Sequence, residues 1–227
     1  MTQFSIVTVC TMNICRSPAA QEALTVRSAQ WQLDSSASVV VTSAGTHAVD
    51  GSPACPHTLA ALGLDLPGHA SRPLTTEILN EADLVVTAAE SHVSEAILLA
   101  PTVRQRIFSL PQAARYARWI TNGPVLSTAL AKARGETIVP DFKHPETMTD
   151  PLPADSLGRL HWLVRELDAA RGVAPEAKPS PDRRWGANDI PDPHVLGSEL
   201  HQFAAESIDE SVATLGEAVE LVLDSQP

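Results

Sequence analysis

The chain has 227 residues, of which 44% are hydrophobic, and a formal net charge of -11 from 16 Lys+Arg against 27 Asp+Glu. This length and composition suffice to bury one sizeable core, as a single domain or a domain with an elaboration. The acidic balance argues against nucleic acid or an anionic membrane as a partner, because both attract basic proteins. An anionic substrate would therefore have to be held by local groups.

Cysteine usage and the N-terminal residues bear on the cellular compartment. No apolar stretch approaches the ~20 residues that span a bilayer. The start, MTQFSIVTVC, lacks the basic region and cleavage site of a secretory signal. Cys10, Cys15 and Cys55 are too few and too clustered for a disulfide framework, and no Cys/His pairing has zinc-ligand spacing. We therefore expect a cytoplasmic protein without a metal site, in which at least one thiol is used chemically.

Strands and helices alternate along the first 110 residues. The sequence predicts strands at 4–9, 39–42, 84–87 and 106–110, and helices at 17–30, 56–64 and 91–99. Short apolar strands separated by crossover helices are typical of an α/β fold with an open, four-stranded parallel sheet and helices on both faces. Ligands bind such folds beyond the carboxyl ends of the strands, and Cys10 lies at one such end.

The composition changes near residue 111. Nine of the 18 prolines fall between Pro140 and Pro193, in stretches that we expect to be loops. Apolar residues recur at helical spacing over 157–167, with Asp155 as a candidate N-cap. An amphipathic helix from Ser198 onward would close the domain. The sequence thus predicts one domain over 1–227 that contains a mostly helical, proline-rich insertion at 111–187, as a subdomain or a lid.

The stretch VCTMNICRSP joins the first predicted strand to the first helix. Its loop can curl backbone N–H groups around a tetrahedral oxyanion at a helix N-terminus. The same groups stabilise a thiolate, which makes Cys10 a candidate nucleophile. Arg16 offers a planar fork that takes two phosphate oxygens at once. Ser17 can donate its hydroxyl to the sulfur as it leaves, and Asn13 is suited to a strained turn.

The same stretch resembles the active-site signature of the low-molecular-weight protein tyrosine phosphatases, C-x5-R-[ST] with an asparagine three residues after the nucleophile. Four further segments match that family in order: SAGT at 43–46, GHASRPLT at 68–75, EADLVVTAAESHV at 81–93 and IPDP at 190–193. The resemblance covers about residues 4–110 and 188–224. It implies the flavodoxin-like fold of the type I phosphotyrosine phosphatases.

The resemblance also implies a mechanism. The protein would be a metal-independent phosphomonoesterase, a protein tyrosine phosphatase, which needs no cofactor and forms a cysteinyl-phosphate intermediate. Cys10 would be the nucleophile, Arg16 the phosphate clamp and Asp192 the general acid and base, restricted by a proline on each side. A phosphorylated protein or a small aryl phosphate would be the substrate, and inorganic phosphate the product.

The family pattern assigns further residues to four roles. The phosphate-binding loop would comprise Thr11, Met12, Asn13, Ile14, Cys15, Arg16 and Ser17. The residues that support this loop would be Asn13, Ser17, Ser43 and His69. Cys15 would be the redox partner of Cys10 in a disulfide formed under peroxide, and the substrate walls would be formed by His47, His194 and Val195.

The walls depart from the family pattern. His194 and Val195 stand where relatives often carry aromatic residues, and HAVDGSPAC at 47–55 has no bulky ring. Tyrosine specificity is therefore open, and the insertion at 111–187 could replace the missing walls.

Two other functions use the same loop. An arsenate reductase of this fold would attack arsenic with Cys10, and because no cysteine follows Cys55 it would depend on an external small thiol. A non-catalytic phosphate-binding protein would need the clamp alone, although such a protein would be expected to lose the nucleophile, the clamp or the acid.

Overall fold

The computed structural model describes residues 2–179 and 184–226 and contains a four-stranded parallel sheet in the order β2-β1-β3-β4. The strands are β1 (Thr2–Cys10), β2 (Ala37–Gly45), β3 (Leu84–Thr87) and β4 (Ile107–Ser109). The predicted fold class is confirmed. Because β1 lies between β2 and β3, its last residue, Cys10, is at the middle of the carboxyl edge of the sheet.

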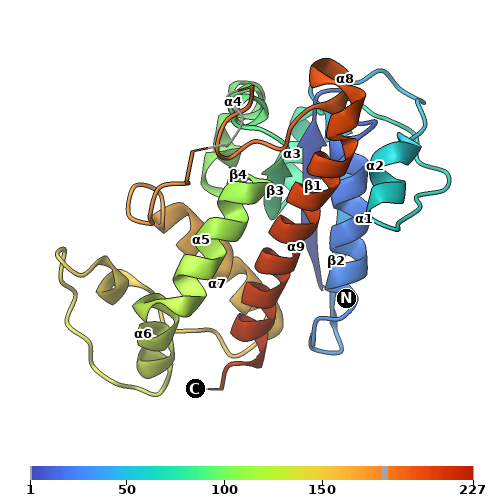
Figure 1. Ribbon diagram of the computed structural model, residues 1–227. Helices are drawn as coiled ribbons and strands as arrows, with labels where there is room; N and C mark the ends of the chain where they lie inside the picture. The colour runs from blue at the N-terminus through green and yellow to red at the C-terminus, as the bar shows by residue number, and fades with distance from the viewer. Residues whose placement is uncertain (1, 180–183, 227) are drawn as a thin grey trace.

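Helices cover both faces of this sheet. Phe4 and Ile6 of β1 belong to one hydrophobic cluster and Val7 and Val9 to another, as the alternation of side chains along a strand requires. The first cluster is completed by α1 (Arg16–Ser28), α2 (Pro56–Ala61), α5 (Leu110–Asn122), α6 (Pro124–Ala133), α7 (Ser156–Ala169) and α9 (His201–Asp224), and the second by α3 (Thr76–Glu81), α4 (Glu90–Leu99) and the 3-10 helix η1 (Pro101–Arg106). Figure 1 shows α1, α5 and α9 side by side along the first face.

The segment after β4 is more helical than its proline content suggests. The sequence analysis predicted neither α5 nor α6 (Pro124–Ala133), yet each begins with a proline in its first turn, where the missing N–H costs no hydrogen bond. The prediction of α7 is confirmed, with the Asp155 side chain accepting a hydrogen bond from Gly158 N at 2.7 Å. A short 3-10 helix, η2 (Pro145–Met148), interrupts the predicted loop at 140–153.

Part of the insertion contributes to the main core. Ile120 of α5 and Leu163 of α7 are buried in the same cluster as Ile208 and Leu215 of α9. Trp162 is fully buried there, and its indole N–H donates to Asp150 O at 3.2 Å. Val125, Leu126 and Ala129 of α6 join the same cluster, but α6 lies at the end of the molecule away from α8 (Pro193–Leu196) (Figure 1). The packed helices brace α9, whereas α6 is distant from the carboxyl edge of β1.

The chain returns to that edge before its last helix. After the segment at 184–192, α8 and the 3-10 helix η3 (Ser198–Leu200) lead into α9, close to the predicted start of the closing helix.

Among the described helices, none is both long enough and apolar enough to cross a membrane.

Candidate active site

The loop between β1 and α1 turns its carbonyl groups outward. The carbonyl oxygens of Cys10, Thr11 and Ile14 accept hydrogen bonds from the backbone N–H groups of Thr46 (3.0 Å), His47 (2.8 Å) and Cys55 (2.7 Å). The N–H groups of residues 12–15 have no backbone acceptor in the described part of the chain. They are therefore free to bind an anion on the inner side of the loop, at the N-terminus of α1.

Asn13 holds the turn in the middle of this loop. Among the described residues it is the one non-glycine with a positive φ, +53°, a conformation that asparagine tolerates better than most residues. Its side-chain oxygen accepts from Arg72 N at 3.0 Å and its side-chain amide donates to Ser17 Oγ at 3.0 Å. His69 Nε2 donates to the Asn13 carbonyl oxygen at 2.8 Å. The structure thus brings Asn13, Ser17 and His69 together, as the family pattern implied.

Ser17 connects Asn13 to the sulfur of Cys10. The Ser17 hydroxyl lies 3.0 Å from Cys10 Sγ. Its oxygen accepts a hydrogen bond from Asn13, so its own proton can be donated to the sulfur, which is closer than the alternative acceptor, Ala44 O at 3.5 Å. Cys10 is only 3% exposed, so the hydroxyl is directed at a sulfur with little water around it. Such a donor stabilises a thiolate and also eases its departure from phosphorus.

Gly45, at the end of β2, lets this loop pass close to the sheet. A Cβ atom on Gly45 would lie 2.7 Å from both Asn13 N and Thr11 O, well inside van der Waals contact. The SAGT motif therefore has a steric role, because any side chain here would push the loop away from the strand.

Arg16 contacts both the loop that follows β1 and the segment at 188–197, which carries Asp192 and is called the acid loop below. Its guanidinium, in a residue only 6% exposed, donates to Ile190 O at 3.2 Å and to Thr11 Oγ1 at 3.3 Å, and it forms an ion pair with the Asp192 carboxylate. The other Asp192 oxygen accepts from His194 N at 3.0 Å, which caps α8. The predicted clamp and the predicted acid thus touch each other directly.

Asp189 anchors the segment that carries Asp192, and the sequence analysis did not identify it. One carboxylate oxygen of Asp189 accepts from Glu90 N at 2.8 Å and the other from Gly186 N at 3.0 Å. Next to it, Ile190 N donates to Ala88 O at 2.8 Å. Only its position, three residues before the predicted acid, could have singled Asp189 out.

His92 of α4 is a second residue that the sequence analysis missed, although it lies within a matched segment. Its Nε2 atom is 3.0 Å from Thr11 Oγ1. Because Arg16 already donates to that oxygen, Thr11 can donate its proton to His92. Burial, and then the charge of Arg16, lower the pKa of His92 to about 4, so the imidazole accepts this bond in its neutral form.

The predicted catalytic residues share one cavity. It has a volume of about 410 Å³ and is lined by Cys10, Thr11, Met12, Ile14, Cys15, Arg16, Asp192, His194 and Val195. Two of the three residues expected as substrate walls, His194 and Val195, are among them. Cys10 and Asp192 thus line one cavity from the two ends of the predicted catalytic set.

Two predicted site residues lie elsewhere. The side chain of His47 is 66% exposed, with Nδ1 3.6 Å from a carboxylate oxygen of Glu95, and it does not line the cavity. The Ser43 hydroxyl donates to Gln21 Oε1 at 2.6 Å instead of contacting the loop. Arg72 provides that link instead, because its Nε donates to Ser43 O and its backbone N to Asn13. The direct roles expected for His47 and Ser43 are therefore not seen.

Cys15 lies beside Cys10 in the loop but faces a different environment. Its sulfur is 2.9 Å from Thr58 Oγ1, and burial raises the pKa of the thiol to about 12. All three cysteines are free thiols in the structure. The Cys10–Cys15 disulfide stays a prediction, and burial makes Cys15 a weak nucleophile for forming it at neutral pH.

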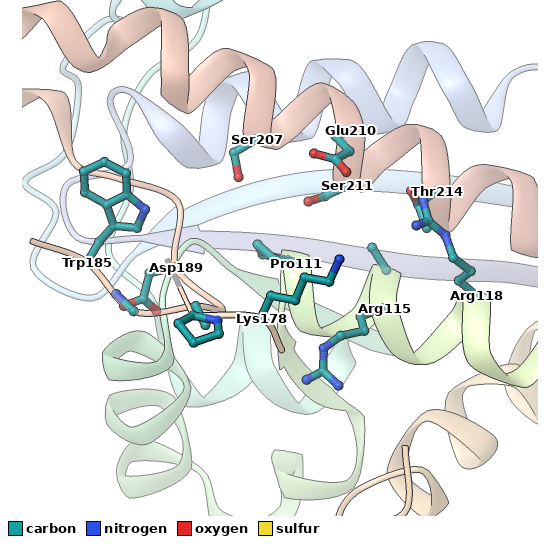
Figure 2. A pocket seen from close by; sticks show the side chains of 14 residues that line it. Pro111, Arg115, Arg118, Lys178, Trp185, Asp189, Ser207, Glu210, Ser211 and Thr214 are labelled. Atoms are coloured by element: carbon teal, nitrogen blue, oxygen red, sulfur yellow. Dashed lines mark hydrogen bonds between the residues drawn. The ribbon is translucent and has the colours of Figure 1, made fainter. Parts of the chain in front are cut away.

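A second cavity of about 570 Å³ lies between α5, α9 and the segments at 178–179 and 185–189. Figure 2 shows Lys178 extending between the two helices, with Arg115 on α5 and Glu210 on α9. None of the described residues that line it also lines the cavity over Cys10. Asp189 borders it, so this cavity lies behind the acid loop and holds no part of the predicted catalytic set.

Comparison with known proteins agrees with this geometry. The profile of the family described as low molecular weight phosphotyrosine protein phosphatase matches residues 5–119, just over half of the chain. The low molecular weight protein-tyrosine-phosphatase Etp of Escherichia coli (strain K12) is 37% identical over 103 residues, which are 44% of this chain and 64% of Etp. The match thus spans slightly less than two thirds of that relative.

Two further matches extend the comparison. The protein-arginine-phosphatase of Bacillus subtilis (strain 168) is 36% identical over 110 residues, 47% of this chain and 70% of that protein. Wzb of Vibrio vulnificus, solved in complex with benzylphosphonate, has a TM-score of 0.55 and 19% identity, over 94% of this chain and 97% of that one. That structural likeness shows a shared fold. The profile match over residues 5–119 shows that the chain belongs to the low molecular weight phosphotyrosine protein phosphatase family.

Proposed function

We propose that the protein is a phosphomonoesterase that forms a cysteinyl-phosphate intermediate and acts on phosphotyrosine in proteins or on related aryl phosphates. The observation that carries this proposal is the convergence of Cys10, Arg16 and Asp192 on one cavity of about 410 Å³. Arg16 and the inward N–H groups supply the positive charge that a phosphoryl group needs, so the mechanism requires no metal. Cytoplasmic location remains a prediction.

In the first step, Cys10 Sγ attacks phosphorus and the bond to the leaving oxygen breaks. The equatorial oxygens are held by the loop N–H groups and by two N–H groups of Arg16. Asp192 gives its proton to the departing oxygen. General acid catalysis of this kind contributes roughly 10²–10⁴ in rate.

In the second step, water attacks the phosphorus of the thiophosphate, and the sulfur leaves. The Asp192 carboxylate accepts a proton from that water, and the Ser17 hydroxyl stabilises the departing sulfur from its position 3.0 Å away. Inorganic phosphate then dissociates and returns the site to its starting state.

The contact between Arg16 and Asp192 gives the acid loop two positions. Before substrate binds, the Asp192 carboxylate takes the place on Arg16 where phosphate oxygens would bind. A phosphate dianion competes for the same N–H groups. Its binding would therefore release Asp192 and leave the carboxyl group near the leaving oxygen.

The cavity wall favours an uncharged leaving group. Met12, Ile14 and Val195 are apolar, and Asp192 is the one carboxylate among the described lining residues. A phosphoarginine substrate would bring a guanidinium, which needs a second negative charge if Asp192 acts as the acid. The 36% identity to a protein-arginine-phosphatase nevertheless makes phosphoarginine the second candidate. An arsenate reductase or a non-catalytic binding protein has no observation in its favour.

We further propose that the insertion at 111–187 belongs to a single domain over 1–227 and that its described helices pack against the rest of that domain. The support is that α5 and α7 share the main hydrophobic cluster with α9, and that α6 lies away from α8 (Figure 1). The insertion would then influence the site through Asp189 and the segment at 184–189 rather than by closing over it.

Steady-state hydrolysis tests the proposed function. The substrates are p-nitrophenyl phosphate, a phosphotyrosine peptide and a phosphoarginine peptide of the same sequence, with a chelator present. Wild type should hydrolyse the first two, Cys10→Ser should have no measurable rate, and Asp192→Ala should lose about 10²–10⁴ in kcat on the phosphotyrosine peptide.

The matched control is Asp168→Ala, on α7, where the carboxylate contacts Arg171 at 2.8 Å. It should keep wild-type kinetics. A higher kcat/KM on the phosphoarginine peptide than on the phosphotyrosine peptide would make phosphoarginine, and not phosphotyrosine, the substrate class. If none of the three substrates were hydrolysed, the proposal would be overturned.

A further inference from the structure

Three potential metal ligands from distant parts of the chain converge beside the cavity. They are Cys15 in the phosphate loop, Cys55 just before α2 and His194 at the start of α8. One ligand atom from each lies within 4.8 Å of the other two. Both cysteines are buried and are free thiols, whereas His194 is exposed.

Two more imidazoles lie against this group. The ring of His201 is 5.1 Å from that of His57 and 5.3 Å from that of His194, between centroids. His201 Nδ1 is also 3.9 Å from Cys15 Sγ. Two of the chain's three cysteines and three of its eight histidines are therefore gathered at one place, although the chain has 227 residues. Thiolates with imidazole form the ligand set that selects zinc.

The backbone around these side chains is already fixed. Cys55 N donates to Ile14 O at 2.7 Å, so Cys55 is tied to the loop that contains Cys15. His194 N donates to Asp192 at 3.0 Å, which holds the first turn of α8. In a tetrahedral zinc site, bonds of about 2.3 Å to sulfur and 2.0 Å to nitrogen place ligand atoms roughly 3.5–3.8 Å apart. Binding would therefore require the three side chains to rotate toward one another by about 1 Å.

We propose that Cys15, Cys55 and His194 bind one Zn²⁺ ion, with His201, whose Nδ1 is 3.9 Å from Cys15 Sγ, as the imidazole available for a fourth bond. Two S–H bonds are replaced by two Zn–S bonds, and the two protons pass to solvent. In the sequence, 39 residues lie between Cys15 and Cys55, and 138 lie between Cys55 and His194. These separations are too long for the local spacing of a zinc-binding motif, so the sequence analysis could not identify the site.

The ion would act as a reversible inhibitor, and this part rests on the proposed phosphatase function. Cys15 and His194 both line the cavity over Cys10. Zinc between them ties the phosphate loop to α8, two residues after Asp192. The Asp192 carboxylate would then be held against Arg16, and phosphate could not displace it.

Binding is tested first with Co²⁺, without any measurement of activity. The full chain, reduced and freed of metal, is titrated with Co²⁺. Wild type should show the sulfur-to-cobalt charge-transfer band and the visible bands of a four-coordinate site, both abolished by one equivalent of Zn²⁺. Cys55→Ser and His194→Gln should each weaken Zn²⁺ binding by more than about 10²-fold, because losing a ligand costs more than losing one of its supporting contacts.

Inhibition is then measured with p-nitrophenyl phosphate. Cys55→Ser should keep the wild-type rate without metal and should need at least about tenfold more Zn²⁺ for half inhibition. The matched control, His57→Gln, removes a neighbouring imidazole that the proposal does not assign to the metal, and it should follow wild type in both experiments.

Two results would overturn the metal site. One is the absence of a charge-transfer band, and the other is a band that Cys55→Ser leaves unchanged. Equal zinc inhibition of wild type and Cys55→Ser would overturn the inhibitory role of the site, because it would put the inhibiting ion on Cys10 itself. An enzyme without turnover would refute the phosphatase proposal alone, since the cobalt spectrum would still decide whether the site exists.

Discussion

The phosphate loop, residues 10–17, and the acid loop, residues 188–197, face the same cavity but are held in different ways. The phosphate loop continues directly from β1 into α1. A single residue of this loop, Asn13, makes hydrogen bonds to three residues: Ser17, His69 and Arg72. In the described part of the chain, the acid loop makes fewer hydrogen bonds to surrounding residues, and several of these join residues far apart in the sequence. Asp189 and Glu90 are 99 positions apart, and Ile190 and Arg16 are 174.

This difference suits the two tasks. Phosphate must meet donors that are already in place, because reorganising them during the reaction would cost rate. The acid must move between Arg16 and the leaving oxygen, so its segment should open at a low cost in free energy. A rigid clamp beside a weakly anchored acid is therefore the arrangement that the proposed reaction requires.

The rigidity of the phosphate loop can be broken at Gly45. In Gly45→Ala, the new Cβ would lie 2.7 Å from Asn13 N and Thr11 O, so the loop must shift. Displacing reacting groups by about 1 Å can cost 10²-fold in rate, so we expect a loss of up to that size in kcat/KM for p-nitrophenyl phosphate.

Gly123→Ala is the control for that change. Its Cβ would lie 2.6 Å from Trp119 O between α5 and α6, so the crowding is similar but remote from Cys10. We expect Gly123→Ala to lower the free energy of unfolding by about 1–3 kcal/mol and to leave kcat/KM for p-nitrophenyl phosphate unchanged. Equal kinetics for the two variants would mean that the loop does not depend on Gly45.

The contribution of Asp189 to the position of the acid loop can be tested by substitution. In Asp189→Ala, the hydrogen bonds to Glu90 N and Gly186 N are lost, so Asp192 is less often in place for proton transfer. We expect kcat on the phosphotyrosine peptide to fall about tenfold with little change in KM. Steady-state kinetics separate the two constants, and an increase in KM alone would show instead that Asp189 affects substrate binding.

At His92, behind the phosphate loop, the expected effect is on stability and not on the rate of the reaction. The pKa of His92 in the folded chain is about 4, against 6.5 when unfolded. The folded state therefore binds fewer protons between these values, and stability that is present above pH 6.5 is lost as the pH falls toward 4. The shift corresponds to at most about 3 kcal/mol.

Denaturant unfolding of wild type and His92→Gln at several pH values measures this loss. The variant should lose less free energy of unfolding between pH 7 and pH 4, because glutamine can accept the Thr11 hydrogen bond without titrating. The control is His144→Gln, whose side chain is 64% exposed. Parallel pH profiles for wild type and His92→Gln would contradict the neutral, buried state of this imidazole.

Much of the fold could be read from local sequence. The four strands were predicted from short apolar runs, and α7 from its apolar spacing and its Asp155 cap. Helices α5 and α6 were not located individually, although the insertion that contains them was expected to be mostly helical. Both helices bury alanine and branched residues against the main core, and such tertiary packing is not visible in a local pattern.

The sequence by itself determined the chemistry of the phosphate loop, because Cys10, Asn13, Arg16 and Ser17 lie in one short segment whose geometry is set by a strand end and a helix start. Only the tertiary structure decided which distant residues complete the site. Arg72, His92 and Asp189 reach it through folding of the whole chain, and Ser43 and His47 turn away from it. The direction of a side chain depends on its packed neighbours, and these are chosen when the sheet and its helices assemble.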